Sequence, residues 1–116
     1  MIVPRKVYAI QHNVTKKIYV GSSRNVDNRY KAHIGYLRRG THPIEDMQFD
    51  YDQFGEDYSV FILDEIATFG QRTKEQEWMR KLKSYIRSKG YNYKDPSFKE
   101  SIISVPHKKG IPETID

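Results

Sequence analysis

Two short runs near the N-terminus constrain the fold of this chain most strongly. Residues 6–11 (KVYAIQ) and 17–21 (KIYVG) alternate apolar and polar side chains, which is the period of a β-strand. Only the short polar segment HNVTK separates them, and this spacing favours an antiparallel β-hairpin. We therefore expect the fold to be built around a sheet that starts with this hairpin.

The register of the hairpin decides which side chains share a face of the sheet. If Gln11 pairs with Lys16 across a four-residue loop, Tyr8 lies directly opposite Tyr19. Opposed residues share one face, so the two tyrosine rings should be neighbours. Gly21 then ends the second strand, at a point where the backbone turns or is approached closely.

A helix over residues 26–39 is predicted to follow the hairpin. Asn25 or Ser23 is placed to cap its N-terminus, and Gly40 follows its last turn as a stop signal. The apolar stripe that should face the core consists of Val26, Tyr30, Ile34 and Leu37. A neighbouring stripe consists of Arg29, His33 and Tyr36. The arginine and the histidine should therefore lie along one edge of the buried face.

Three more elements are predicted beyond this helix. Pro43 is placed at the first position of a short helix that Gly55 ends. Residues 58–66 (YSVFILDEI) are the most apolar run and predict the central strand of the sheet. A last helix is predicted over residues 72–88, before Gly90.

Glu75 is the most unusual residue of the last predicted helix. The apolar stripe of this helix consists of Trp78, Met79, Leu82, Tyr85 and Ile86. Glu75 precedes Trp78 by three residues, so its carboxylate should lie on the core-facing side. A carboxylate in that place is costly without a partner, and we expect the partner to be Arg29 or a divalent metal ion.

Length, charge and composition limit the classes of function. The chain has 116 residues and a formal net charge of +5, which favours one folded domain, over residues 1–93, and an anionic partner such as nucleic acid. It has no cysteine, which excludes disulfides, thiolate zinc sites and a cysteine nucleophile. No apolar run has the length of a membrane span and no signal-peptide core is present, so an intracellular, cytoplasmic protein is expected. Residues 94–116 show little periodicity, and we expect a surface-packed or partly disordered tail.

Taken in order, these motifs resemble the catalytic domains of the GIY-YIG nuclease family. The first family signature, Gly-Ile-Tyr, stands here as Lys6-Val7-Tyr8. The second, Tyr-Ile-Gly, stands as Tyr19-Val20-Gly21 and is followed by Ser22. The other family positions, an arginine with a histidine four residues later, a glutamate three residues before a tryptophan and a late asparagine, match Arg29, His33, Glu75 and Asn92. The resemblance covers residues 6–93 and is nearest to the catalytic domains of phage and intron homing endonucleases.

The resemblance implies both a fold and a reaction. The fold would be an α+β sandwich, with a small three-stranded mixed or antiparallel sheet flanked by helices. The reaction would be metal-dependent hydrolysis of DNA phosphodiester bonds. One Mg²⁺ or Mn²⁺ per active site would be held by Glu75, because magnesium keeps most of its waters and needs few protein ligands.

The resemblance also implies roles for the other matched residues. Arg29 has a planar guanidinium that pairs with phosphate oxygens and would stabilise the transition state. Tyr8 would accept a proton from the attacking water, and Tyr19 would hydrogen-bond in the water and metal network. His33 would orient Tyr8 or take its proton onward. Asn92 would fix the positions of its neighbours.

Contacts to DNA are expected from basic residues and from the turn after the second strand. The substrate-binding candidates are Gly21, Ser22, Lys31, Arg38 and Arg39. Further basic candidates are Lys16, Lys17, Arg24, Arg72, Lys74, Arg80, Lys81 and Lys83. These residues would neutralise phosphates or would only solubilise the surface. The sequence contains no recognisable DNA-recognition motif, so we expect a stand-alone nuclease, the catalytic piece of a longer protein, or a partner that supplies recognition, in a monomer or a transient dimer.

Each motif also has a simpler structural explanation. Tyrosines in a hairpin are commonly strand formers, an arginine and a histidine at i, i+4 are commonly a solvated face, and an inward glutamate can pair with an arginine. His12, His42 and His107 look like loop residues, and none of them is assigned to a metal site. The second hypothesis is therefore a catalytically idle module on the same fold that binds nucleic acid or a protein. The order and spacing of the whole set favour the nuclease.

Overall fold

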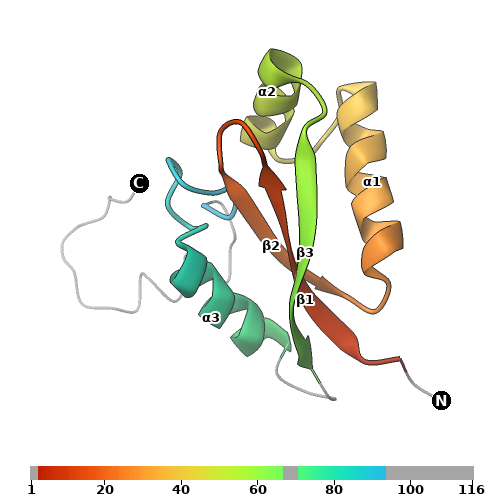
Figure 1. Ribbon diagram of the computed structural model, residues 1–116, viewed down its shortest axis with the longest axis vertical. Helices are drawn as coiled ribbons and strands as arrows, with labels where there is room; N and C mark the ends of the chain where they lie inside the picture. Colours follow the sequence, from red (N-terminus) through yellow and green to blue (C-terminus); the bar gives the residue numbers. More distant parts are fainter. Residues whose placement is uncertain (1–2, 67–70, 94–116) are drawn as a thin grey trace.

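The computed structural model of the chain describes residues 3–66 and 71–93. Its elements are β1 (Arg5–His12), β2 (Ile18–Ser23), α1 (Val26–Arg39), α2 (Glu45–Phe54), β3 (Tyr58–Ile66) and α3 (Gln71–Leu82). The strands form an antiparallel sheet in the order β2-β1-β3, with α1 and α2 against one face and α3 against the other (Figure 1). The α+β sandwich is therefore confirmed. The expected tail over residues 94–116 lies outside the described residues, and no helix within them is long and apolar enough to cross a membrane.

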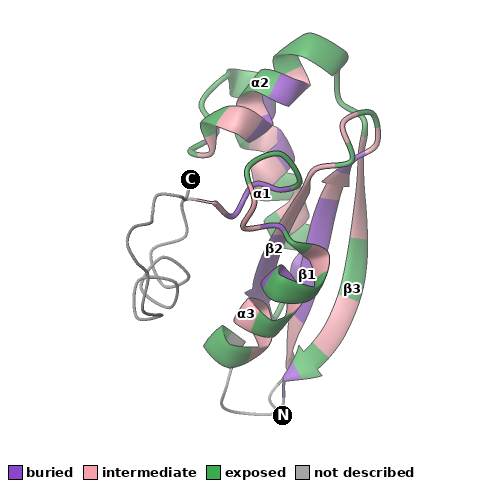
Figure 2. Ribbon diagram, turned by 90° about the vertical axis from the view of Figure 1, so that its left-hand side faces the viewer, coloured by how far each residue is buried: buried purple, intermediate pink, exposed green. Residues whose placement is uncertain are grey.

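The central strand of the sheet is β1, so the prediction that residues 58–66 form the central strand is wrong. β3 pairs only with β1 and lies at an edge. Its Phe61 and Ile62 are 46% and 54% exposed, whereas β1 is buried from Val7 to Ile10 (Figure 2). Apolar content alone did not distinguish a central strand from an edge strand, because burial depends on which helices cover each face.

The hairpin of β1 and β2 forms, but its register differs from the predicted one. Tyr8 pairs with Gly21 and Ile10 pairs with Tyr19, so Tyr8 is not directly opposite Tyr19. The His12 N–H donates to the Lys17 carbonyl at 3.0 Å, which moves the four-residue loop one position along the chain. Because side chains alternate with a period of two, this two-residue shift keeps both tyrosines on one face of the sheet.

The buried ring of His12 explains the position of this loop. Its Nδ1 accepts the N–H groups of Val14 and Thr15 at 3.1 and 3.4 Å, and its Nε2 donates to the Gly55 carbonyl at 3.2 Å. The His12 ring therefore supplies hydrogen-bond partners to backbone groups of the loop and to Gly55. His12 is the last residue of β1 and is buried, so the prediction that it is a loop residue is wrong.

Helix α1 has both predicted ends. The Asn25 side chain accepts the Asn28 N–H at 3.0 Å, and Gly40 ends the helix in the left-handed region with φ 74°. Val26, Ile34 and Leu37 are buried, as the apolar stripe predicts.

The ends of the other two helices differ from the predictions. Pro43 lies before Ile44, the N-terminal cap of α2, rather than at the first helical position. Helix α3 ends at Leu82 rather than at residue 88, because Lys83 has a positive φ of 59° and the chain turns back. Gly90 permits this return, since a Cβ there would lie 2.2 Å from the Ser84 Cα. Sequence periodicity continued past Leu82 and hid the break.

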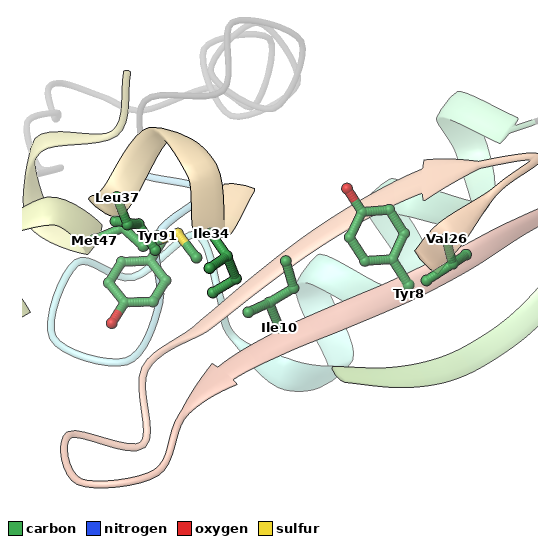
Figure 3. Packing of buried hydrophobic residues seen from close by; sticks show 7 residues of the cluster. All are labelled: Tyr8, Ile10, Val26, Ile34, Leu37, Met47 and Tyr91. Atoms are coloured by element: carbon green, nitrogen blue, oxygen red, sulfur yellow. The ribbon is translucent and has the colours of Figure 1, made fainter. Parts of the chain in front are cut away.

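The sheet has a core on each face. Figure 3 shows the core on the α1 and α2 side, which consists of Tyr8, Ile10, Val26, Ile34, Leu37, Met47 and Tyr91. The core on the α3 side consists of Val7, Val20, Ile66 and Met79. Neighbouring residues of β1 and β2 therefore belong to opposite cores, and this alternation distributes the predicted site residues over both faces.

Candidate active site

Tyr8 and Tyr19 lie side by side on the α1 face of the sheet. Their ring centroids are 6.1 Å apart, and Tyr8 is completely buried. Gly21 allows this arrangement, because a Cβ at that position would lie 2.9 Å from both the Tyr8 hydroxyl and the Tyr19 ring. Gly21, predicted as a substrate-binding residue, is thus also the residue that leaves room for the Tyr8 hydroxyl.

His33 approaches the same hydroxyl from α1. Its Nε2 lies 3.3 Å from the Tyr8 Oη, and its ring centroid is 5.0 Å from that of Tyr19. The predicted stripe on α1 therefore does bring His33 over the two tyrosines.

His42, which no sequence motif singles out, extends this arrangement. It is 6% exposed, and its Nε2 lies 2.8 Å from the Nδ1 of His33, with the two rings stacked. Its Nδ1 accepts the Ile44 N–H at 3.0 Å. His42 lies in the connection between α1 and α2, as predicted for a loop residue, and this turn carries its ring back onto the site.

The backbone bond fixes the proton positions along this row. Because the Ile44 N–H donates to His42 Nδ1, the proton of neutral His42 lies on Nε2 and is donated to His33 Nδ1. The proton of neutral His33 then lies on Nε2 and is donated to the Tyr8 oxygen. The Tyr8 hydroxyl accepts from His33, so its own proton is left for another partner.

Burial keeps both histidines neutral. It lowers the pKa of His33 to about 4, with further lowering from His42 and Arg29, and it lowers the pKa of His42 to about 4. Burial also raises the pKa of the Tyr8 hydroxyl, and Tyr19 adds to this, while Arg29 opposes it. Tyr8 is therefore a neutral phenol at neutral pH in the free protein.

Glu75 meets β2 from the other face of the sheet. The Ser22 hydroxyl donates to the Glu75 Oε2, and Ser22 itself is 8% exposed. Within the described part of the chain, the carboxylate forms no ion pair with Arg29, so the expected Arg29–Glu75 pair is not present. Arg29 is exposed on α1, one turn before His33.

The site residues thus form two groups that are separated by the end of β2. Tyr8, Tyr19 and His33 lie on the α1 face, whereas Ser22 and Glu75 lie on the α3 face. Successive residues of β2 point to opposite faces, which places the two groups on either side of the backbone near Gly21.

Asn92 lies behind the site rather than in it. Its Oδ1 accepts the Val20 N–H at 2.7 Å, and its Nδ2 donates to the Val20 carbonyl at 3.0 Å. The side chain is 4% exposed and acts as a short substitute for a neighbouring strand. It therefore holds the backbone between Tyr19 and Gly21.

Several predicted DNA contacts are occupied within the protein. Arg38 forms a bidentate pair with Glu56 at 2.7 Å for both bonds. Lys74 lies 3.6 Å from Asp64, and the Lys81 ammonium lies over the Trp78 ring. Lys31 and Arg39 are exposed. Arg38 and Lys74 therefore already have an acidic partner, whereas Lys81 contacts an aromatic ring.

A metal ion would have to be held by few protein ligands. The described residues contain no group of three or more His, Asp or Glu side chains that could hold one. A single half-buried carboxylate fits Mg²⁺ or Mn²⁺, which retain water and take further oxygens from a phosphate. Glu75 matches that donor set.

The fold and the site define the class of this protein. The family described as the GIY-YIG catalytic domain matches residues 5–92, and the chain belongs to this family. The expected family resemblance is therefore confirmed over the sheet, the helices and Asn92, whose two bonds to the Val20 backbone we call the Asn92 clamp.

Individual relatives agree with this assignment. The intron-associated endonuclease 1 of Enterobacteria phage T4 is 31% identical over 107 residues, which are 90% of this chain and 43% of that protein. This chain therefore spans less than half the length of that relative. Two solved structures of the catalytic domain of the intron endonuclease I-TevI, one of them a mutant, are each 28% identical. They superpose with TM-scores of 0.70 and 0.68 over 78% and 75% of this chain, and over 93% and 95% of their own.

Proposed function

We propose that the chain is the catalytic part of a metal-dependent DNA endonuclease that hydrolyses phosphodiester bonds. The observation that carries this proposal is the hydrogen-bonded row from His42 through His33 to the Tyr8 hydroxyl, next to a strand end that also positions Glu75. Hydrolysis of a phosphodiester requires a base for the water and charge relief at the phosphate, and the two groups can supply one each. The relatives are named endonucleases, which supports the same class of reaction.

In this proposal Tyr8 first loses its own proton to solvent, and the resulting phenolate takes the proton of the attacking water. Its hydroxyl oxygen already accepts a bond from His33, which favours the ionised oxygen over the neutral one. Burial raises the pKa of Tyr8, so the Arg29 charge and the bond from His33 are needed to make the ionised form accessible. His33 therefore orients Tyr8, because its proton on Nε2 leaves no lone pair there for the Tyr8 proton.

Arg29 and Glu75 act on the phosphate in this proposal. The Arg29 guanidinium is exposed and remains charged, so it can pair with the phosphate oxygens as negative charge develops. Glu75 would hold one Mg²⁺ or Mn²⁺, which supplies charge neutralisation at the phosphate and the leaving oxygen. The Ser22 hydroxyl fixes the orientation of that carboxylate.

DNA is the proposed partner, and recognition of a particular sequence is assigned to a further domain or to a partner protein. The net charge of +5 favours DNA as the partner. A larger protein is consistent with the 43% coverage of the phage relative. We further propose an intracellular location, and a monomer or a transient dimer.

Cleavage of supercoiled plasmid tests the proposal. Wild type and Glu75→Ala should be compared in Mg²⁺, in Mn²⁺ and in EDTA. We expect metal-dependent nicking or linearisation by wild type and its loss in Glu75→Ala. Cleavage that survives the substitution would refute the role of Glu75 in holding the metal. A folded wild type that cuts no DNA would favour an idle binding module on the same fold.

A further inference from the structure

We propose that Arg39 is a contact to the DNA backbone and that Tyr36 positions it for this purpose. The inference rests on the proposed nuclease function and adds a defined binding contact at the C-terminal end of α1. The expected ligand group is a phosphate of the duplex, away from the bond that is cut.

The side chains of Arg39 and Tyr36 form an exposed cation–π pair. The Arg39 guanidinium carbon lies 5.1 Å from the centroid of the Tyr36 ring, and Tyr36 is 44% exposed. A cation–π contact needs no carboxylate partner for the guanidinium. Among the described residues no carboxylate forms an ion pair with Arg39, so its N–H donors remain available for a bidentate bond to phosphate oxygens.

The neighbouring Arg38 is bound by a carboxylate instead of a ring. It gives two N–H groups to the Glu56 carboxylate at 2.7 Å, and this pair raises the pKa of Arg38 and lowers that of Glu56. A phosphate would have to displace a carboxylate to reach that fork. The two adjacent arginines thus differ in what they can bind, because the N–H groups of Arg38 are occupied by Glu56 and Arg39 contacts a ring. Positive charge at the helix end alone would not distinguish them.

The pair is continuous with the proposed active site. The Tyr36 ring meets the edge of the His42 ring at a centroid distance of 6.3 Å, and His42 stacks on His33, which bonds to Tyr8. One row of contacting rings therefore runs from the catalytic tyrosine to Arg39. DNA bound at Tyr8 would pass near this end of α1.

The salt dependence of DNA binding tests the inference. Wild type should be titrated with duplex DNA in EDTA, which prevents metal-dependent cutting, over a range of salt concentrations. A lost phosphate contact lowers the slope of log affinity against log salt by about one, and it weakens binding equally on unrelated sequences. We expect this result for Arg39→Ala and for Tyr36→Leu, and near wild-type slopes for Tyr36→Phe, which keeps the ring.

Arg38→Ala is the matched comparison, because it removes the same charge from the adjacent residue. We expect a smaller loss of slope than for Arg39→Ala. Equal slopes in Arg39→Ala and wild type, or a fall in thermal stability without a change in slope, would overturn the inference and leave Arg39 as a stabiliser of the helix end. The plasmid assay separates the two proposals, since wild type can cut DNA whether or not Arg39 contributes to the slope.

Discussion

His33 and His42 are neutral side chains in a row of hydrogen bonds, and this state makes the stability of the domain depend on pH. Their pKa values of about 4 lie below the ordinary value of 6.5. Between these values the unfolded chain binds protons that the folded chain does not, so stability is present near neutral pH and is lost as pH falls from about 6.5 to about 4. Each histidine contributes on the order of 3 kcal/mol to this loss.

His42→Gln should show a shallower loss of stability over this pH window, because glutamine does not titrate there. Urea denaturation at a series of pH values measures the effect. A variant whose stability falls as steeply as that of wild type would show that His42 is not held neutral. His42 had no signal in the sequence, since its contact depends on where the turn after Gly40 leads.

The bond from Ser22 to Glu75 leads to a second prediction at this scale. Ser22→Ala removes the donor that orients the carboxylate, and loss of such a partner weakens metal binding by roughly tenfold or more. Ser22→Thr keeps a hydroxyl and is the control. Calorimetric titration with Mn²⁺ measures affinity without DNA, and an unchanged affinity in Ser22→Ala would refute the orienting role.

Among the elements, β2 depends on a segment far along the chain. Asn92→Ala would leave both backbone groups of Val20 without their partners, at a cost of about 1–3 kcal/mol for each buried group. We expect a loss of stability of this order and faster hydrogen exchange of the Val20 amide. Asn28→Ala, at an exposed position on α1, is the control.

If exchange at Val20 were unchanged in Asn92→Ala, the clamp would not be holding β2. The sequence placed Asn92 near the site but did not show what it binds. The partner is a backbone strand, and backbone groups leave no pattern in a sequence.

The elements also show which local signals were sufficient. Asn25 and Gly40 fixed both ends of α1, because a side-chain cap and a left-handed glycine act within a few residues of the helix. By contrast, the predicted end of α3 and the predicted hairpin register were wrong. The end of α3 depends on Ser84 packing against Gly90, and the hairpin register depends on the His12 ring reaching Gly55. Neither contact leaves a signal in the periodicity of the strand or helix itself.

For the whole molecule, the fold class followed from the hairpin and the amphipathic helices, but the order of strands did not. Phe61 and Ile62 made residues 58–66 look central, yet the helices leave part of this strand uncovered. The matched family positions include Tyr8, Tyr19, His33 and Glu75, which the structure places around the end of β2, and their roles stay predictions. What could not be predicted is that the two groups lie on opposite faces of β2, since this follows from the assembled sheet.

The segment that closes β2 has a consequence for the synthesis of the protein. Gly90 bridges to Ile18, and Asn92 holds Val20, so the outer edge of the strand is completed by the last described residues. Translation has already delivered Tyr8, Tyr19 and every other side chain of the site by that time. A nascent chain that ends before residue 92 therefore carries Tyr8, Tyr19 and Glu75 but lacks the side chain that holds the outer edge of β2.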